Sequence, residues 1–203
     1  MVAMEKIREA EFFLGKMRES YSSQKEFVFY LSACLAACNS IPDYLLEEYN
    51  IKYGLSIPLT ERLYADTFEQ GAKQIGHNDA VSFIQFWKDK MNALRADAIG
   101  SLLVSKRHLD IHRVQVRPDL VKVEIHEASI HISDSIRVEK FNKEGKLVEV
   151  YESPKEELRK KEEGSARVDW FFKEYETEPI MAVCEKFLMT LKDFVEEARK
   201  KFP

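Results

Sequence analysis

The chain has 203 residues, of which 45% are hydrophobic and 11% aromatic, so it can bury a full core and is not expected to be disordered. Its longest apolar run, residues 27–38, is interrupted by Ser32 and is shorter than the roughly 20 residues that cross a bilayer, so no membrane span is expected. The formal net charge of −4 excludes a long-range attraction of the whole molecule for nucleic acid, and a polyanion would need a local basic patch.

The N-terminal residues and the cysteines both favour a cytoplasmic protein. Charged helical sequence begins directly after the first residues, without the pattern of a secretory signal. Cys34, Cys38 and Cys184 are odd in number and have apolar neighbours, which is typical of buried reduced thiols and not of a disulfide framework. The alternative for two of them is a metal-binding pair, because Cys34 and Cys38 stand four positions apart on a predicted helix.

Two helices are predicted at the start of the chain, over residues 4–20 and 24–49. In both segments, apolar residues recur at spacings of three and four, which indicates one buried helical face. Pro42 lies inside the second segment. Because its ring removes a backbone donor and clashes with the preceding turn, we expect this helix to end or kink near Ile41.

A third and a fourth helix are predicted before the hydrophobic pattern changes. The third should begin near Pro58 and stop at Gly76, because proline is favoured in a first helical turn and glycine commonly follows a helix end. Asn78 or Asp79 should cap the fourth helix, whose apolar face continues to Leu102. We expect this helix to lead directly into a basic segment that contains two histidines.

Beyond that basic segment the hydrophobic period changes from helical to alternating, which predicts β-strands. The alternating segments, in chain order, are residues 121–126, 130–132, 136–138 and 148–150. A glycine-containing turn at residues 142–145 is expected to form a hairpin connection, and residues 167–172 suit a further strand.

The predicted fold class is α+β, mainly α. Residues 1–113 are expected to form a helical bundle, and residues 114–203 a β-rich appendage with a small antiparallel β-meander. The chain should close with an amphipathic helix from Pro179 to about Lys201, in which apolar residues recur at helical spacing. We expect the appendage and its helix to pack on the bundle.

The basic segment at the end of the bundle carries the reagents for phosphodiester chemistry. Arg107 can hold a phosphate, and His108 and His112 can move a proton near neutral pH. Three further basic side chains extend the positive charge and are candidate RNA contacts, namely Lys106, Arg113 and Arg117. The alternative interpretation is structural, because basic side chains often cap a helix end or pair with carboxylates elsewhere.

Four segments together resemble a HEPN-type helical domain, and the resemblance covers the first half of the chain. They are residues 9–14, residues 26–37, the tryptophan-bearing fourth helix and residues 107–112. Members of this superfamily are helical bundles that carry an arginine, a polar residue, a short spacer and a histidine. Arg107, His108 and His112 match that order with the shortest permitted spacer, so the resemblance implies a HEPN-like bundle in residues 1–113.

The resemblance also implies an activity. Active HEPN proteins are metal-independent ribonucleases in which two subunits bring two arginine–histidine pairs together, which implies a homodimer, an RNA substrate and no cofactor. Arg107 would stabilise the extra negative charge on a pentavalent phosphate, and His112 would act as acid or base. His108 would orient or polarise the reacting groups.

Two other functions are left open by the sequence. A non-catalytic HEPN-like protein would act as an interaction or scaffold protein and bind a protein partner, as such domains do in toxin–antitoxin or defence systems. A metal site is the lesser alternative: His108, Asp110 and His112 share a face on a strand, whereas on a helix only the two histidines do. His126 and His131 are further candidate ligands. Arg107 and Arg113, which flank residues 108–112, would however repel a dication.

Overall fold

The computed structural model divides the chain into two compact units. The helical unit comprises residues 1–121 and 170–203, and the β unit comprises residues 122–169. The residues whose backbone is described are 2–58, 63–112, 118, 120–126, 137–141, 147–152 and 165–203, and the side chains described are those of 2–58, 63–106, 118 and 169–203.

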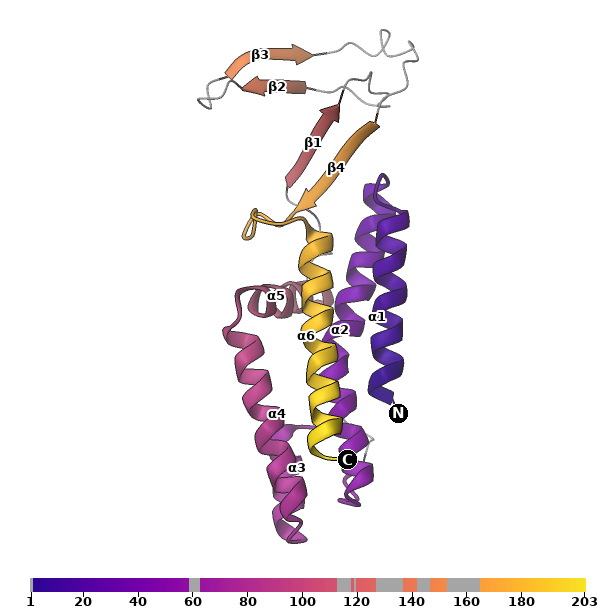
Figure 1. Ribbon diagram of the computed structural model, residues 1–203, viewed down its shortest axis with the longest axis vertical. Coiled ribbons are helices and arrows are strands. Elements are labelled where there is room, and N and C mark those ends of the chain that lie inside the picture. Colours follow the sequence, from indigo (N-terminus) through magenta and orange to yellow (C-terminus); the bar gives the residue numbers. More distant parts are fainter. Residues whose placement is uncertain are drawn as a thin grey trace. The chain divides into compact units, whose positions relative to one another are not determined.

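The described part of the helical unit is built almost entirely of helices. In chain order they are α1 (Val2–Glu19), α2 (Gln24–Lys52), α3 (Ala65–Gln74), α4 (Asn78–Ala96), α5 (Ala98–His112) and α6 (Ile180–Lys201). Helices α1, α2, α4 and α6 extend roughly along one direction, and α5 lies across them (Figure 1). The chain is therefore mainly α, as predicted. None of its described helices is long and apolar enough to cross a membrane.

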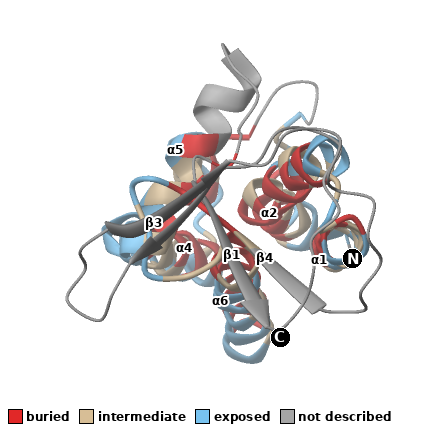
Figure 2. Ribbon diagram, turned by 90° about the horizontal axis from the view of Figure 1, so that it is seen from above, coloured by how far each residue is buried: buried red, intermediate tan, exposed pale blue. Residues whose placement is uncertain are grey.

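The core of the helical unit is made by the apolar faces that the sequence predicted. Helices α1 and α2 pack against each other, and both bury apolar residues at helical spacing, including Ile7 and Met17 of α1 and Phe27 and Leu31 of α2. Figure 2 shows the buried residues gathered on the inward sides of the helices, with exposed residues outside. The periodicity of the sequence is thus confirmed by the packing of these two helices.

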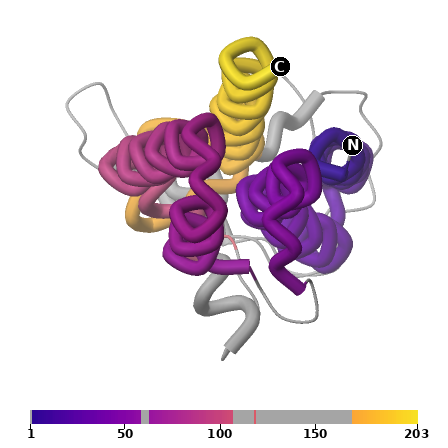
Figure 3. Tube along the Cα trace, turned by 90° about the horizontal axis from the view of Figure 1, so that it is seen from below, coloured from indigo at the N-terminus to yellow at the C-terminus, as the bar shows by residue number. Residues whose placement is uncertain are grey.

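Helix α6 belongs to the helical unit. It begins directly after Pro179, as predicted, and contacts α1, α2, α4 and α5. Figure 3 shows it between α1 and α4 in the view from below. Its buried face includes Phe187 and Leu191. The boundary predicted between residues 113 and 114 therefore differs from the observed division, which assigns α6 to the bundle because its apolar face is covered by other helices.

Helix α2 does not end at Pro42. It is continuous from Gln24 to Lys52, so the prediction of a stop near Ile41 is wrong. Proline inside a helix costs about 3 kcal/mol. That cost is offset by apolar burial on both sides, because Ile41 and Leu45 are fully buried and each such side chain contributes about 1.5–3 kcal/mol.

Helices α3 and α4 begin at positions other than those predicted. The backbone of residues 55–58 is not helical, and α3 begins at Ala65. The N-cap of α4 is His77, whose imidazole Nδ1 accepts a hydrogen bond from the Ala80 amide at 3.3 Å. Neither Asn78 nor the residue after it is the cap, since both already lie inside the helix.

The long fourth helix predicted from the sequence is two helices separated at Asp97. The backbone of Asp97 is extended, with φ −72° and ψ 139°, and its carboxylate accepts a hydrogen bond from the Gly100 amide at 2.8 Å. Asp97 is therefore the N-cap of α5. A Cβ atom at Gly100 would lie 2.0 Å from the Leu94 carbonyl oxygen, so the two helices meet at a point that only glycine allows.

The described strands form two two-stranded sheets. β1 (Leu120–His126) pairs with β4 (Ser165–Phe171), and β2 (Arg137–Phe141) pairs antiparallel with β3 (Leu147–Glu152). A single β-meander is therefore not shown among these strands. The predicted strand at residues 130–132 and the predicted turn at 142–145 lie outside the described residues.

Candidate functional site

The arginine–histidine segment occupies the last two turns of α5. Arg107, His108 and His112 all have helical backbone, and the helix ends at His112. The prediction that the segment lies in a helix of the bundle is therefore confirmed for the backbone of residues 107–112. The side chains of residues 107–112 and the predicted RNA contacts Arg113 and Arg117 lie outside the described parts of the chain.

Helical geometry sets the relative placement of the candidate residues. Successive residues are about 100° apart around a helix axis, so positions 108 and 112 lie within about 40° of each other. Positions 107 and 112 lie about 140° apart, and position 110 lies about 160° from both histidines. On this helix Asp110 does not share a face with His108 and His112, which leaves two of the three proposed metal ligands together.

The side chain of Lys106 is described, and it lies inside the protein. Only 8% of Lys106 is exposed, and its ammonium Nζ lies 3.0 Å from Oε1 and 2.9 Å from Oε2 of Glu174. The same ammonium stands 5.0 Å from the centre of the buried Phe172 ring, in cation–π geometry. The lysine predicted as an RNA contact thus has a carboxylate partner and an aromatic partner within its own chain.

This contact defines which side of α5 faces the bundle near the motif. Lys106 and the fully buried Leu103 lie within about 60° of each other around the axis, on the side that meets the rest of the helical unit. Positions 108 and 112 lie about 160° and 120° from Lys106. The two histidine positions are therefore on the part of the helix circumference that is turned away from Lys106.

The described side chains also line an open polar cavity that the sequence did not predict. Its volume is about 470 Å³, and it is lined by Asp43, Leu63, Tyr64, Ala65, Asp66, Trp87, Lys88, Met91, Asn92 and Arg95. Lys88, Asn92 and Arg95 follow each other at helical spacing along α4, and that spacing is the only trace of the cavity in the sequence.

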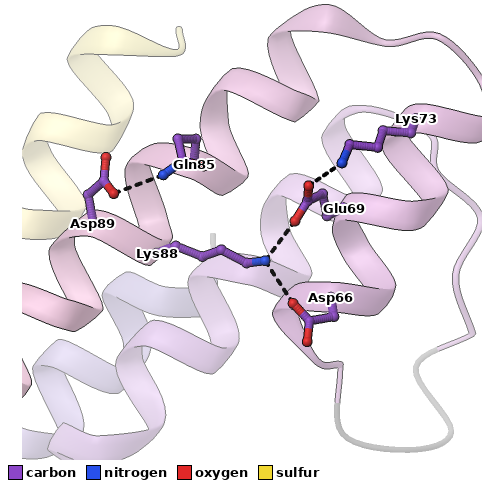
Figure 4. A network of polar contacts seen from close by, with 6 residues as sticks. All are labelled: Asp66, Glu69, Lys73, Gln85, Lys88 and Asp89. Atoms are coloured by element: carbon purple, nitrogen blue, oxygen red, sulfur yellow. Dashed lines mark hydrogen bonds and ion pairs between the residues drawn. The ribbon is translucent and has the colours of Figure 1, made fainter.

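Ion pairs between α3 and α4 neutralise the charged side chains on one wall of this cavity. Lys88 reaches from α4 to Asp66 at 2.7 Å and to Glu69 at 2.6 Å, while Lys73 also binds Glu69 (Figure 4). Hydrogen bonds from Lys73 and Lys88 lower the pKa of Glu69 to about 2. The lysine is thus already neutralised by two carboxylates, so this wall offers no uncompensated lysine to a ligand.

Comparisons with protein-family models, curated proteins and solved structures found no match to this chain. The resemblance to HEPN domains consequently depends on this chain's own residues. Those residues are the two apolar segments in α1 and α2, the tryptophan helix α4, and the arginine and histidines of α5.

The three cysteines are free and buried, as predicted. Hydrogen bonds with Cys34 and burial raise the pKa of the Cys38 and Cys184 thiols well above its usual value. Thiols with a raised pKa stay protonated, whereas hydrogen bonds from Cys184 and Cys38 lower the pKa of the Cys34 thiol to about 5. Within the described residues, no group of three histidine, cysteine or acidic side chains is placed to hold a metal ion.

Proposed function

We propose that this protein is a metal-independent endoribonuclease of the HEPN type that acts as a homodimer in the cytoplasm. The observation that supports the proposal is the position of the arginine–histidine segment. It occupies the last turns of a bundle helix, with the histidine positions on the side of the helix turned away from the buried Lys106. Catalytic residues in that position can meet a substrate, whereas residues on the Lys106 side would meet the protein core.

Each residue has a separate role in the proposed chemistry. Arg107 binds the scissile phosphate and stabilises the additional negative charge of its pentavalent transition state. His112 exchanges a proton with the attacking 2′-hydroxyl or the leaving oxygen, and His108 orients the reacting groups. Arg113 and Arg117 add phosphate contacts, which the negative net charge of the chain makes necessary for RNA binding.

A second subunit is part of this proposal for a geometric reason. Positions 107 and 112 are about 140° apart on one straight helix, so a single α5 presents them to different sides. Two copies of α5 that approach each other bring the arginine of each chain toward the histidine of the other. The active unit is therefore the dimer.

The decisive experiment is RNA cleavage in excess chelator. The full chain should cleave a structured RNA in EDTA, and His112→Ala and Arg107→Ala should each lose about 100-fold or more of the activity, because a positioned proton transfer contributes about 10²–10⁴-fold and a preorganised cation about 10²–10³-fold. Arg95→Ala, which removes an exposed arginine of α4, is the matched control and should keep full activity. Equal cleavage by wild type and His112→Ala would refute the proposal.

A non-catalytic interaction protein is the second candidate function. The observation that favours it is a set of large apolar side chains exposed on the helices, including Phe12 at 58%, Phe29 at 52% and Met189 at 66%. Exposed aromatic side chains are common at protein interfaces. A chain that cleaves no RNA but forms a dimer that Phe12→Ser and Phe29→Ser disrupt would support this candidate. Stoichiometric metal in elemental analysis would instead support the His108 and His112 metal site.

A further inference from the structure

We infer that Lys106 is a positioning residue for the arginine–histidine segment and not one of its phosphate contacts. Its ion pair with Glu174, made over the ring of Phe172, holds the last turns of α5 in one rotational setting. The ion pair and the ring contact belong to the described structure, and the catalytic consequence of the anchoring rests on the proposed function.

The contact between Lys106 and Glu174 has the burial and the geometry of a structural ion pair. Lys106 donates a hydrogen bond to Oε1 of Glu174 at 3.0 Å, and its ammonium lies 2.9 Å from Oε2, so it contacts both oxygens of the carboxylate. Its side chain is 10% exposed, whereas that of Glu174 is 56% exposed. A lysine this buried loses most of its hydration and needs a compensating carboxylate. An ammonium on a phosphate-binding surface would instead be open to solvent.

The other side of the contact is also fixed to the bundle. Phe172 is fully buried and forms an isolated β-bridge with Tyr175, which closes a tight turn around Glu174. Two residues earlier, Trp170 stacks on Phe27 with ring centres 5.9 Å apart. Its indole also donates to a carbonyl oxygen in the turn between α1 and α2 at 2.9 Å. Glu174 therefore stands on a segment that cannot follow α5 if the helix rotates.

The position of Lys106 along α5 gives the contact its importance. The start of the helix is held by the Asp97 cap and by Gly100 against Leu94, and its middle by the buried Leu103. Lys106 is the last described contact before Arg107. Helix ends fray unless side chains hold them, so the order of the catalytic turns depends on this residue.

The test separates anchoring from phosphate binding with two measurements on the full chain. The variants are Lys106→Met, which keeps the length of the side chain without its charge, and Lys106→Arg, which can restore the pair. Lys90→Met is the matched control, because Lys90 pairs with Glu197 at 2.5 Å on a more exposed surface of α4 and α6. We measure amide hydrogen exchange over residues 107–112, and kcat and KM for RNA cleavage.

Anchoring predicts that Lys106→Met speeds exchange over residues 107–112 about tenfold while exchange in α1 and α2 is unchanged. It predicts that kcat falls about 10- to 100-fold with little change in KM, because misplaced catalytic groups lose rate and not affinity. Lys106→Arg should recover most of the protection from exchange and most of kcat. Lys90→Met should change neither.

Phosphate binding predicts the opposite pattern. Lys106→Met would then raise KM, lower the salt dependence of RNA binding by about one phosphate contact, and leave hydrogen exchange unchanged. That result overturns the inference. If the wild-type chain cleaves no RNA, the proposed function fails. The comparison of exchange rates over residues 107–112 in Lys106→Met and Lys90→Met still tests whether Lys106 anchors the end of α5. Unchanged exchange in a folded Lys106→Met variant refutes it.

Discussion

The indole N–H of Trp87 in α4 donates a hydrogen bond to the carbonyl oxygen of Pro42 in α2, at 3.0 Å and away from solvent. The contact lies at the proline that interrupts the hydrogen-bond ladder of α2, so it joins two helices at the weakest point of one of them. Nearby, Tyr49 of α2 stacks on Phe83 of α4 with ring centres 3.9 Å apart. Aromatic side chains thus connect the kink-prone part of α2 to α4.

Trp87→Phe should therefore destabilise the helical unit. The substitution keeps most of the apolar contact but removes the indole hydrogen bond to the Pro42 carbonyl oxygen, and one such hydrogen bond contributes about 0.5–1.5 kcal/mol. Urea denaturation followed by circular dichroism measures the loss. Trp170→Phe removes a comparable indole hydrogen bond, to the Tyr21 carbonyl oxygen at 2.9 Å, and serves as a reference. A Trp87→Phe variant as stable as wild type would show that the bond to Pro42 contributes nothing.

Gly100→Ala should destabilise the junction of α4 and α5 by about 1–3 kcal/mol, because the new Cβ would lie 2.0 Å from the Leu94 carbonyl oxygen and the backbone must shift. The control is Gly15→Ala in α1, where the added Cβ would meet nothing within 4 Å beyond the backbone of its own helix. That substitution should stabilise the chain by about 0.5–1 kcal/mol through helix propensity alone. Thermal unfolding of both variants measures these changes: Gly100→Ala should lower the melting temperature, and Gly15→Ala should raise it.

Asp97→Ala should weaken the start of α5. The carboxylate of Asp97 accepts a hydrogen bond from the Gly100 amide, and loss of an aspartate N-cap costs about 0.5–2 kcal/mol. Asp97→Asn keeps an accepting oxygen and should cost much less. Hydrogen exchange of the first turn of α5 reports the change, and equal protection in the two variants would contradict the assignment of Asp97 as the cap.

The pairing of α3 with α4 should weaken in acid. Hydrogen bonds from Lys73 and Lys88 lower the pKa of Glu69 to about 2. A carboxylate with a lowered pKa stabilises the folded state above its unfolded pKa of about 4.3, and this contribution is lost as the pH falls toward the folded value. The difference in urea midpoint between wild type and Glu69→Gln should therefore shrink from pH 5 to pH 2. A difference that is constant over that range would refute this coupling.

Much of the helical architecture was predictable because it depends on local periodicity. The apolar spacing in α1 and α6 and the proline before Ile180 predicted those helices close to their observed bounds. The free, buried state of the cysteines followed from their apolar neighbours. Within the candidate site, the residues Arg107, His108 and His112 and their helical backbone also came from the sequence.

Other features depended on residues far apart in the chain. No local pattern reveals that buried side chains around Pro42 hold α2 together, or that the Leu94 carbonyl oxygen meets Gly100. The alternating pattern predicts each strand separately, so it could not predict that β1 pairs with β4.

Composition and periodicity by themselves determined that the chain is mainly α, that it buries an apolar core, and that one helix ends in an arginine and two histidines. Only the tertiary structure decided where Lys106 lies. Its partners Glu174 and Phe172 are more than sixty residues away, as the separation of 68 between Lys106 and Glu174 shows. A local sequence pattern predicts that a charged side chain is exposed to solvent. Burial of the charge requires a counter-charge nearby, and here that counter-charge comes from a distant part of the folded chain.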